Sequence, residues 1–366
     1  MTLKSLGEDA YFVASNSANG FFCHYSECFD DLRVRRVFAV KGGPGTGKSH
    51  FMRAVAEYAQ TRAWSCEYIY CSSDPSSLDG VILSSGNDCV ALLDATAPHV
   101  YEPRTPGVRE EIVNLGAFWD GAKLGEHAEK IEEWNKKKKE GYQMAYRYLS
   151  AYGEMSENRD ALVAPYIRHE AMEDYAEKLF WDIPCGKRFS MRHALIRSIG
   201  MKGIVGFDTY FAQAKRIFLV EDCRGSAQYF MRLLYHLAER KRLRIRVSHD
   251  PILPERIDGI LICENGYVFA VGKPEECAYP YKRIGTRRFV DISAMKEIKA
   301  PLNHAEQMCR AMLGGAVDAM ARVCDAHFHI EELYVASMDF AEKEKFTKAF
   351  CERLFPLQSE ESCDTI

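Results

Sequence analysis

Residues 37–49 of the chain read VFAVKGGPGTGKS. The apolar residues at 37–40 predict a short buried strand, and the apolar positions within 51–59 recur at helical spacing. Between them, residues 42–49 fit the pattern G-x-x-x-x-G-K-[ST], which is typical of phosphate-binding loops. The stretch therefore predicts a strand, a glycine-rich loop, and a helix that begins near Lys48.

The residue types in this loop suit phosphate chemistry. Glycines allow a tight backbone whose N–H groups point inward, and the helix N-terminus adds partial positive charge. Lys48 would reach the β- and γ-phosphates, and the Ser49 hydroxyl would bind Mg²⁺. Lys41, just before the loop, is expected to be a solvated charge at a strand end. The residues predicted to bind the nucleotide are Gly42, Gly43, Pro44, Gly45, Thr46, Gly47, Lys48, Ser49 and His50.

A second element with a functional pattern is VALLD at residues 90–94. A buried strand that ends in an acid can present Asp94 beside a phosphate-bound Mg²⁺. The alternative is that Asp94 caps the turn that follows it. We predict Lys48 and Asp94 as catalytic residues, and Ser49 and Asp94 as metal ligands. The catalytic base is not identifiable, because no Glu directly follows Asp94.

Two further residues are candidates for contact with a substrate. His99 lies in a proline-rich loop beyond the predicted strand 90–94, at an edge where α/β sheets bind ligands. Asp74 follows another predicted strand, 66–71, and could orient a water or an acceptor hydroxyl. The alternatives are a surface loop for His99 and a structural turn for Asp74, since the pair Asp-Pro recurs at residues 250–251.

The two halves of the chain repeat one another. Five short segments recur in the same order, which favours an internal duplication over two unrelated α/β domains. The matched segments are 36–40 with 216–220, 51–53 with 230–232, 73–75 (and 78–82) with 249–251 (and 257–261), 112–115 with 289–292, and 127–129 with 304–306.

The second copy of the glycine-rich loop has lost the groups that phosphate binding needs. Residues 221–228 read EDCRGSAQ, so Ala227 and Gln228 replace the lysine and hydroxyl, and two acids are added. Carboxylates at this place would repel a triphosphate. The strand 267–271 also ends without a carboxylate. We therefore expect the C-terminal copy to bind no nucleotide in the ordinary way.

Composition places the chain among ordinary globular proteins. It has 366 residues, 47% hydrophobic and 27% charged, with a formal net charge of −4. No apolar run approaches a membrane span, and no signal peptide is evident, so the chain reads as cytosolic with no membrane partner. The 13 cysteines form no C-x-x-C pair, which predicts free thiols. Cys23, His24 and Cys28 are expected to be core and surface residues, because no second cluster with ligand spacing follows.

The predicted fold is α/β, with two P-loop-type three-layer units, each a mostly parallel sheet flanked by helices. The N-terminal unit spans residues 1–182 with a helical insertion at about 121–180, and the C-terminal unit spans 183–366 with terminal helices. Lysines 136–139 and nearby tyrosines could bind nucleic acid, but the dense acids around them favour a solvated helix face instead. Residues 358–366 are expected to fray.

These motifs resemble an uncharacterised bacterial family of tandem P-loop ATPase-like proteins, sometimes labelled nucleotide-kinase-like. The resemblance covers nearly the whole chain. Family members often carry a second glycine-rich loop, and this sequence departs from them at that position. The resemblance rests on residues 41–49, 94–99, 106–107 and 114–119.

The expected function is Mg²⁺-dependent binding and hydrolysis of ATP or GTP by the N-terminal copy. One alternative is a phosphotransferase acting on a nucleotide or other small acceptor, which would need an acceptor pocket near Asp74 and His99. Another is a nucleotide-gated binding protein with little turnover, in which the C-terminal half contacts a protein partner.

Overall fold

The computed structural model describes residues 2–3, 8–29, 33–97 and 101–356. The chain forms two compact units that are interleaved along the sequence, and each is described by itself. Unit 1 comprises Met1–Asp31, Ile69–Ser77 and Trp134–His327, and unit 2 comprises Leu32–Tyr68, Leu78–Glu133 and Phe328–Ile366. The domain boundary predicted between residues 182 and 183 follows the sequence repeat, and it stays a prediction.

Unit 2 contains the glycine-rich loop. Its elements are β5 (Arg36–Lys41), α2 (Lys48–Gln60), most of β6 (Ser65–Tyr70), β7 (Leu78–Ser85), β8 (Asp88–Asp94), β9 (Glu110–Asn114), η1 (Leu115–Phe118), α3 (Gly121–Gly125) and α9 (Phe340–Leu354).

Unit 1 contains the N-terminal hairpin and the sheet of the C-terminal copy. The long helices α4 (Ala128–Val163) and α8 (Lys299–Val335) belong to it from Trp134 and up to His327 respectively. Its other elements are β1 (Thr2–Leu3), β2 (Asp9–Tyr11), β3 (Ala14–Ser17), β4 (Gly20–Cys23), α1 (Tyr25–Phe29), η2 (Ala164–Tyr166), α5 (His169–Phe180), β10 (Ser190–His193), β11 (Arg197–Gly200), β12 (Gly203–Phe207), α6 (Thr209–Gln213), β13 (Arg216–Glu221), α7 (Ala227–Arg240), β14 (Arg244–His249), β15 (Ile257–Ile262), β16 (Tyr267–Val271), η3 (Pro274–Glu276), β17 (Lys282–Gly285), η4 (Thr286–Phe289) and η5 (Ala294–Lys296).

The structure is α/β with two similar six-stranded sheets, in agreement with the predicted duplication. Their strand orders are β2-β6-β7-β8-β5-β9 and β10-β14-β15-β16-β13-β17. Both sheets mix parallel and antiparallel pairs; in the second, β10–β14, β16–β13 and β13–β17 are parallel. β5 is parallel to β8 and β9, but β7 is antiparallel to β8. The reason is local: the turn at Gly86, like the turn at Gly266 between β15 and β16, is too short to allow a parallel crossover.

One predicted match within the repeat is wrong. Ile112 lies beside Ala39 in the first sheet, and Arg283 lies beside Leu219 in the second. Arg283 therefore occupies the place of Ile112, whereas the sequence match put Phe289 there. The two segments share apolar composition, and composition alone does not fix register.

The core of unit 2 is built around β5, which is buried because it has parallel neighbours on both sides. The apolar face of α2 packs on this sheet and includes Phe51, which is fully buried. Helix α9 completes the unit. Its Phe350 ring lies 5.0 Å from the ring of Phe38 and 5.1 Å from that of Phe51.

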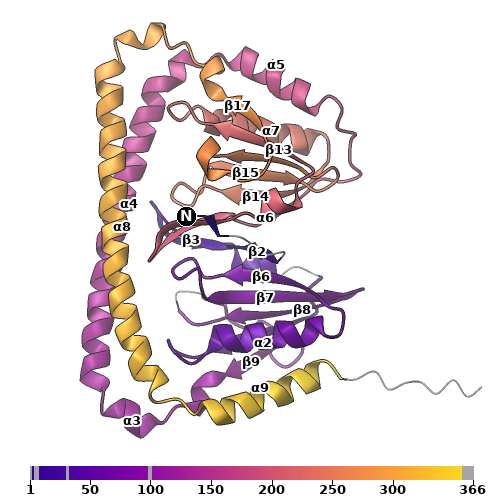
Figure 1. The fold of residues 1–366 in the computed structure, drawn as a ribbon, viewed down its shortest axis with the longest axis vertical. Coiled ribbons are helices and arrows are strands. Elements are labelled where there is room, and N and C mark those ends of the chain that lie inside the picture. Colours follow the sequence, from indigo (N-terminus) through magenta and orange to yellow (C-terminus); the bar gives the residue numbers. More distant parts are fainter. Residues whose placement is uncertain (1, 4–7, 30–32, 98–100, 357–366) are drawn as a thin grey trace, which may run out of the picture. The chain divides into compact units, whose positions relative to one another are not determined.

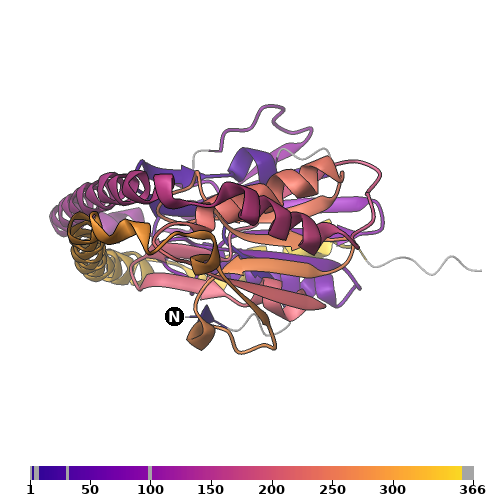
Figure 2. The same ribbon diagram turned by 90° about the horizontal axis from the view of Figure 1, so that it is seen from above.

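In unit 1, the segments that open the two copies form two matching hairpins, β3–β4 and β11–β12. The parts of α4 and α8 in this unit run side by side in both Figure 1 and Figure 2. Their contact is close, since a Cβ on Gly141 would lie 2.7 Å from Val323, and one on Gly315 would lie 2.6 Å from Tyr148. Across the described ranges, no helix is both long enough and apolar enough to cross a bilayer.

Candidate functional site

The glycine-rich loop joins β5 to α2 in unit 2, as the sequence predicts. Gly45 and Gly47 have φ angles of 71° and 73°, a left-handed conformation that residues with a Cβ rarely adopt. A Cβ on Gly42 would lie 2.7 Å from the hydroxyl oxygen of Thr46. Thr46 is itself fully buried and donates a hydrogen bond to the carbonyl oxygen of Gly43 at 2.9 Å. The loop is thus a tight backbone turn at the start of a helix.

Lys48 folds back over this turn. Its ammonium donates hydrogen bonds to the carbonyl oxygens of Gly42 and Gly43, at 2.8 and 2.9 Å. It also lies 3.5 Å from Oδ2 of Asp94, and both side chains are largely buried. The structure therefore brings together the two residues predicted as catalytic, which are 46 positions apart in the sequence (48 to 94).

Asp94 caps the turn that follows it and also faces the glycine-rich loop. It ends β8 beside Val40 of β5, and its Oδ1 accepts a hydrogen bond from the backbone N–H of Thr96 at 2.8 Å. That bond is the turn cap. Oδ2 is the oxygen that faces Lys48. One carboxylate can therefore hold the turn and present a charge to the loop.

Ser49 lies in the first turn of α2, next to the loop. Its hydroxyl oxygen accepts a hydrogen bond from the backbone N–H of Leu78 at 2.9 Å. A hydroxyl oxygen carries a second lone pair, so this bond is compatible with metal ligation. His50, the last residue predicted to bind nucleotide, is exposed on α2.

The C-terminal segment of the chain covers the loop, which the sequence analysis did not foresee. A Cβ on Gly45 would lie 2.8 Å from the carbonyl oxygen of Glu331, and one on Gly43 would lie 3.2 Å from Tyr334. A Cβ on Gly47 would lie 2.8 Å from Nζ of Lys343. Thus the end of α8 and the first turn of α9 lie against the three glycines.

Lys343 is the functional candidate that sequence reasoning missed. Its side chain is 2% exposed, and burial lowers the pKa of its ammonium, an effect that Glu344 opposes. The ammonium lies 5.6 Å from the centre of the Phe340 ring, and in the described part of the chain no ion pair or hydrogen bond holds it. Lys343 therefore adds a positive charge beside the glycine-rich turn, where an anion would be stabilised. No motif surrounds Lys343, so no sequence signal could have found it.

In the matching loop of the C-terminal copy, backbone N–H groups are already bonded to a side chain of the protein. Asp222 accepts hydrogen bonds from the backbone N–H groups of Gly225 and Ala227, both at 2.8 Å. Asp160 of α4 adds a second carboxylate beside Gly225, where it pairs with Arg159 and Arg256. Two of the loop N–H groups that a phosphate would need are thus already bonded to a carboxylate of the chain.

The two candidates for substrate contact receive no support. Asp74 holds a turn: its Oδ1 accepts bonds from the N–H and the hydroxyl of Ser76 and from Lys202. Burial alone would raise the pKa of Asp74, but these bonds lower it overall. Asp250 holds the equivalent turn. His99 lies outside the described residues, so its prediction stays open.

Comparison with known proteins assigns no family to this chain: no family model, curated protein or solved structure matches it.

Proposed function

We propose that the loop of residues 42–49 binds ATP or GTP together with Mg²⁺ and hydrolyses it. The observation that carries this proposal is the position of Lys48, held over the loop by two carbonyl oxygens and 3.5 Å from the carboxylate of Asp94. A phosphate-binding lysine and a carboxylate on the adjacent strand are the pair that phosphoryl-transfer sites of this type need. The resemblance to tandem P-loop ATPase-like proteins, and a P-loop type of fold, are part of this proposal.

The residues present fit a bound nucleotide. A Cβ on Gly42, Gly45 or Gly47 would meet neighbouring atoms of the chain, so only glycines allow this tight turn, and the largely buried side chain of Lys343 adds a positive charge beside it. In this proposal Lys48, Lys343 and the loop N–H groups stabilise phosphate charge. Ser49 and Asp94 are the residues that would hold Mg²⁺, which neutralises charge on the β- and γ-phosphates.

A second function is favoured by the cover over the loop. The backbone of Glu331 and the side chain of Val335 lie so close to Gly45 that a Cβ there would be 2.8–2.9 Å from them. If the end of α8 must move to admit or release a nucleotide, that motion limits turnover. The chain would then act as a nucleotide-gated binding protein. No observation favours a kinase in the same way.

One set of measurements separates these functions. Purified chain is titrated with Mg·ATP and Mg·GTP by calorimetry, and free phosphate is measured alone and with a panel of acceptors. Phosphate release without an acceptor supports hydrolysis, tight binding without release supports the gated protein, and acceptor-dependent ADP would indicate a kinase.

The matched variants are Lys48→Ala and Lys41→Ala, two lysines at either end of the same loop. Lys41 is a control because it pairs with Glu102 at 3.6 Å and lies outside the turn. We expect Lys48→Ala to abolish binding, and Lys41→Ala to keep it. Unchanged affinity in Lys48→Ala would remove the proposed site.

A further inference from the structure

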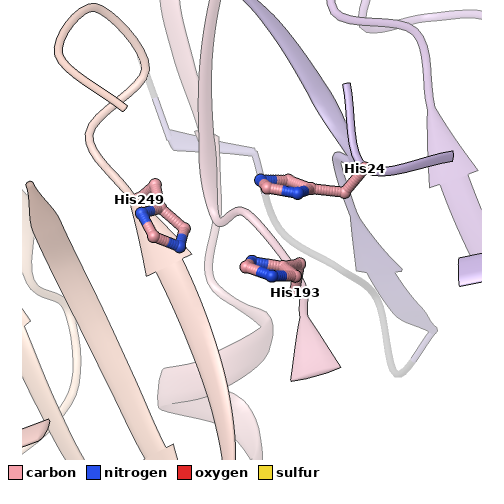
Figure 3. A group of neighbouring side chains, drawn as sticks. All are labelled: His24, His193 and His249. Atoms are coloured by element: carbon pink, nitrogen blue, oxygen red, sulfur yellow. The ribbon is translucent and has the colours of Figure 1, made fainter. Parts of the chain in front are cut away.

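Three histidines from distant parts of the sequence meet in unit 1 (Figure 3). His24 directly precedes α1, His193 ends β10, and His249 ends β14. One ring nitrogen of each lies within 4.8 Å of those of the other two. The rings of His24 and His193 are stacked, with centroids 3.7 Å apart and planes 4° from parallel.

The sheet explains why two of these side chains share a face. β10 is parallel to β14, and His193 lies beside Val247. Residues two apart on a strand point to the same face, so His249 does too. Both histidines end their strands at the carboxyl edge of the sheet, which is the edge where α/β sheets bind ligands.

Glu27 determines which ring nitrogens carry protons. Its Oε2 lies 2.6 Å from Nε2 of His193 and 3.3 Å from Nδ1 of His24. When both of these nitrogens donate to the carboxylate, the other nitrogen of each neutral ring keeps its lone pair. Those two atoms, Nε2 of His24 and Nδ1 of His193, are buried without a hydrogen-bond partner among the described residues. A carboxylate that orients metal-binding histidines in this way is a common feature of metal sites.

The ring of His249 likewise lacks hydrogen-bond partners among the described residues. Both of its ring nitrogens are buried and make no hydrogen bond of ordinary geometry within the described ranges. A buried polar atom left without a partner destabilises the fold, and ligation of a metal ion removes that cost.

The fold itself does not require these histidines. The repeat places Ser73 opposite His249, since the segments 73–75 and 249–251 match. Strands β3 and β11 start at residues 14 and 197, an offset of 183 (197 − 14), which places Ala10 opposite His193. The N-terminal copy therefore builds the same strand ends with small residues, and the imidazoles serve another purpose.

We propose that His24, His193 and His249 bind one Zn²⁺ ion, oriented by Glu27. Three neutral imidazoles suit zinc, and a fourth position remains for water or a substrate. Zinc–nitrogen bonds of about 2.0–2.1 Å place ligand nitrogens roughly 3.3 Å apart in a tetrahedral site. The ligand nitrogens, which lie within 4.8 Å of one another, therefore move closer on binding, and the stacked rings of His24 and His193 tilt out of parallel so that both lone pairs point at one ion.

This proposal departs from the expectation for His24, which was set aside because no second ligand cluster followed it in the sequence. The other two ligands come from residues 193 and 249, too distant for any spacing rule. Cys28, considered together with His24, is not a ligand: its thiol contacts the backbone oxygen of His193 at 3.9 Å.

The test uses the full chain after treatment with a chelator. Zn²⁺ is titrated against a chromophoric competitor, and Co²⁺ is added separately as a spectroscopic probe. We expect one equivalent of Zn²⁺, a higher melting temperature with the metal, and visible Co²⁺ bands of a four- or five-coordinate site. A near-ultraviolet thiolate band would instead place the metal on cysteines and overturn the proposal.

Substitutions of the proposed ligands test where the Zn²⁺ ion binds. His24→Asn, His193→Asn and His249→Asn are each expected to weaken Zn²⁺ binding at least about 100-fold, and Glu27→Gln about 10–100-fold. His236→Asn is the matched control, because His236 also pairs with a glutamate three residues on but is 61% exposed. Zinc affinity that survives all three ligand variants, or falls equally in the control, would refute the site. If a variant fails to fold, as judged by far-ultraviolet circular dichroism, the stoichiometry and Co²⁺ spectrum of the unmodified chain decide.

Discussion

Lys343 lies next to Gly47, although the two are 296 positions apart in the sequence (343 − 47): a Cβ added to Gly47 would lie 2.8 Å from the Lys343 ammonium. The glycine ends the predicted phosphate loop, and the lysine is a buried cation on α9. The contact links the C-terminal helix to the proposed nucleotide site within one compact unit.

Replacing Lys343 by Met should stabilise the nucleotide-free chain and weaken its binding of Mg·ATP. Removal of a buried ammonium without an anion should raise the free energy of unfolding of the nucleotide-free chain. Removal of a charged phosphate contact should weaken Mg·ATP binding by about 10–100-fold. Urea unfolding and calorimetry measure the two effects. Lys345→Met is the control, because Lys345 is 73% exposed and pairs with Glu342. Equal nucleotide affinity in both variants would show that Lys343 has no phosphate role.

Gly45→Ala should destabilise unit 2 more than Gly86→Ala. Both glycines have left-handed φ angles, 71° and 56°, so both substitutions cost about 1–2 kcal/mol of backbone strain. Only at Gly45 would the new Cβ meet a neighbour, the carbonyl oxygen of Glu331 at 2.8 Å, whereas Gly86 has nothing within 4 Å. Thermal unfolding of the two variants measures the difference. Equal losses would mean that α8 does not lie against the loop.

Phe350→Ala tests whether α9 is part of the core of unit 2. The Phe350 side chain is 2% exposed and contacts the rings of Phe38 and Phe51. Its truncation should cost about 3–5 kcal/mol in chemical denaturation. Phe340→Ala, on the same helix but at a side chain 40% exposed, should cost clearly less. A small loss at Phe350 would show that the helix is not docked.

The chain should bind one nucleotide, not two. In the C-terminal copy the carboxylate of Asp222 already accepts bonds from two loop N–H groups. Asp222→Asn removes the charge but restores no lysine, so calorimetry should still give one equivalent of Mg·ATP. Lys48→Ala should reduce that stoichiometry to none. A second equivalent in the unmodified chain, or binding that survives Lys48→Ala, would contradict the assignment of the two loops.

The local pattern was enough to predict much of the fold. An apolar run followed by a glycine-rich turn gave β5 and the start of α2. The mixed direction of the sheets was not predicted, although a tight turn at Gly86 requires an antiparallel pair. The sequence also matched Ile112 to the wrong residue of the C-terminal copy, because two apolar segments can be aligned in several ways.

The sequence by itself determined the strand–loop–helix around Lys48, the duplication, and the replacement of the lysine and hydroxyl residues in the second loop by Ala227 and Gln228. Each of these depends on residues that are neighbours in the chain, where spacing and periodicity express local backbone physics. Only the tertiary structure decided that Lys343 lies against Gly47, and that His24, His193 and His249 share one site. Such contacts arise when packing of the whole chain buries groups that are distant in sequence, and no local pattern records them.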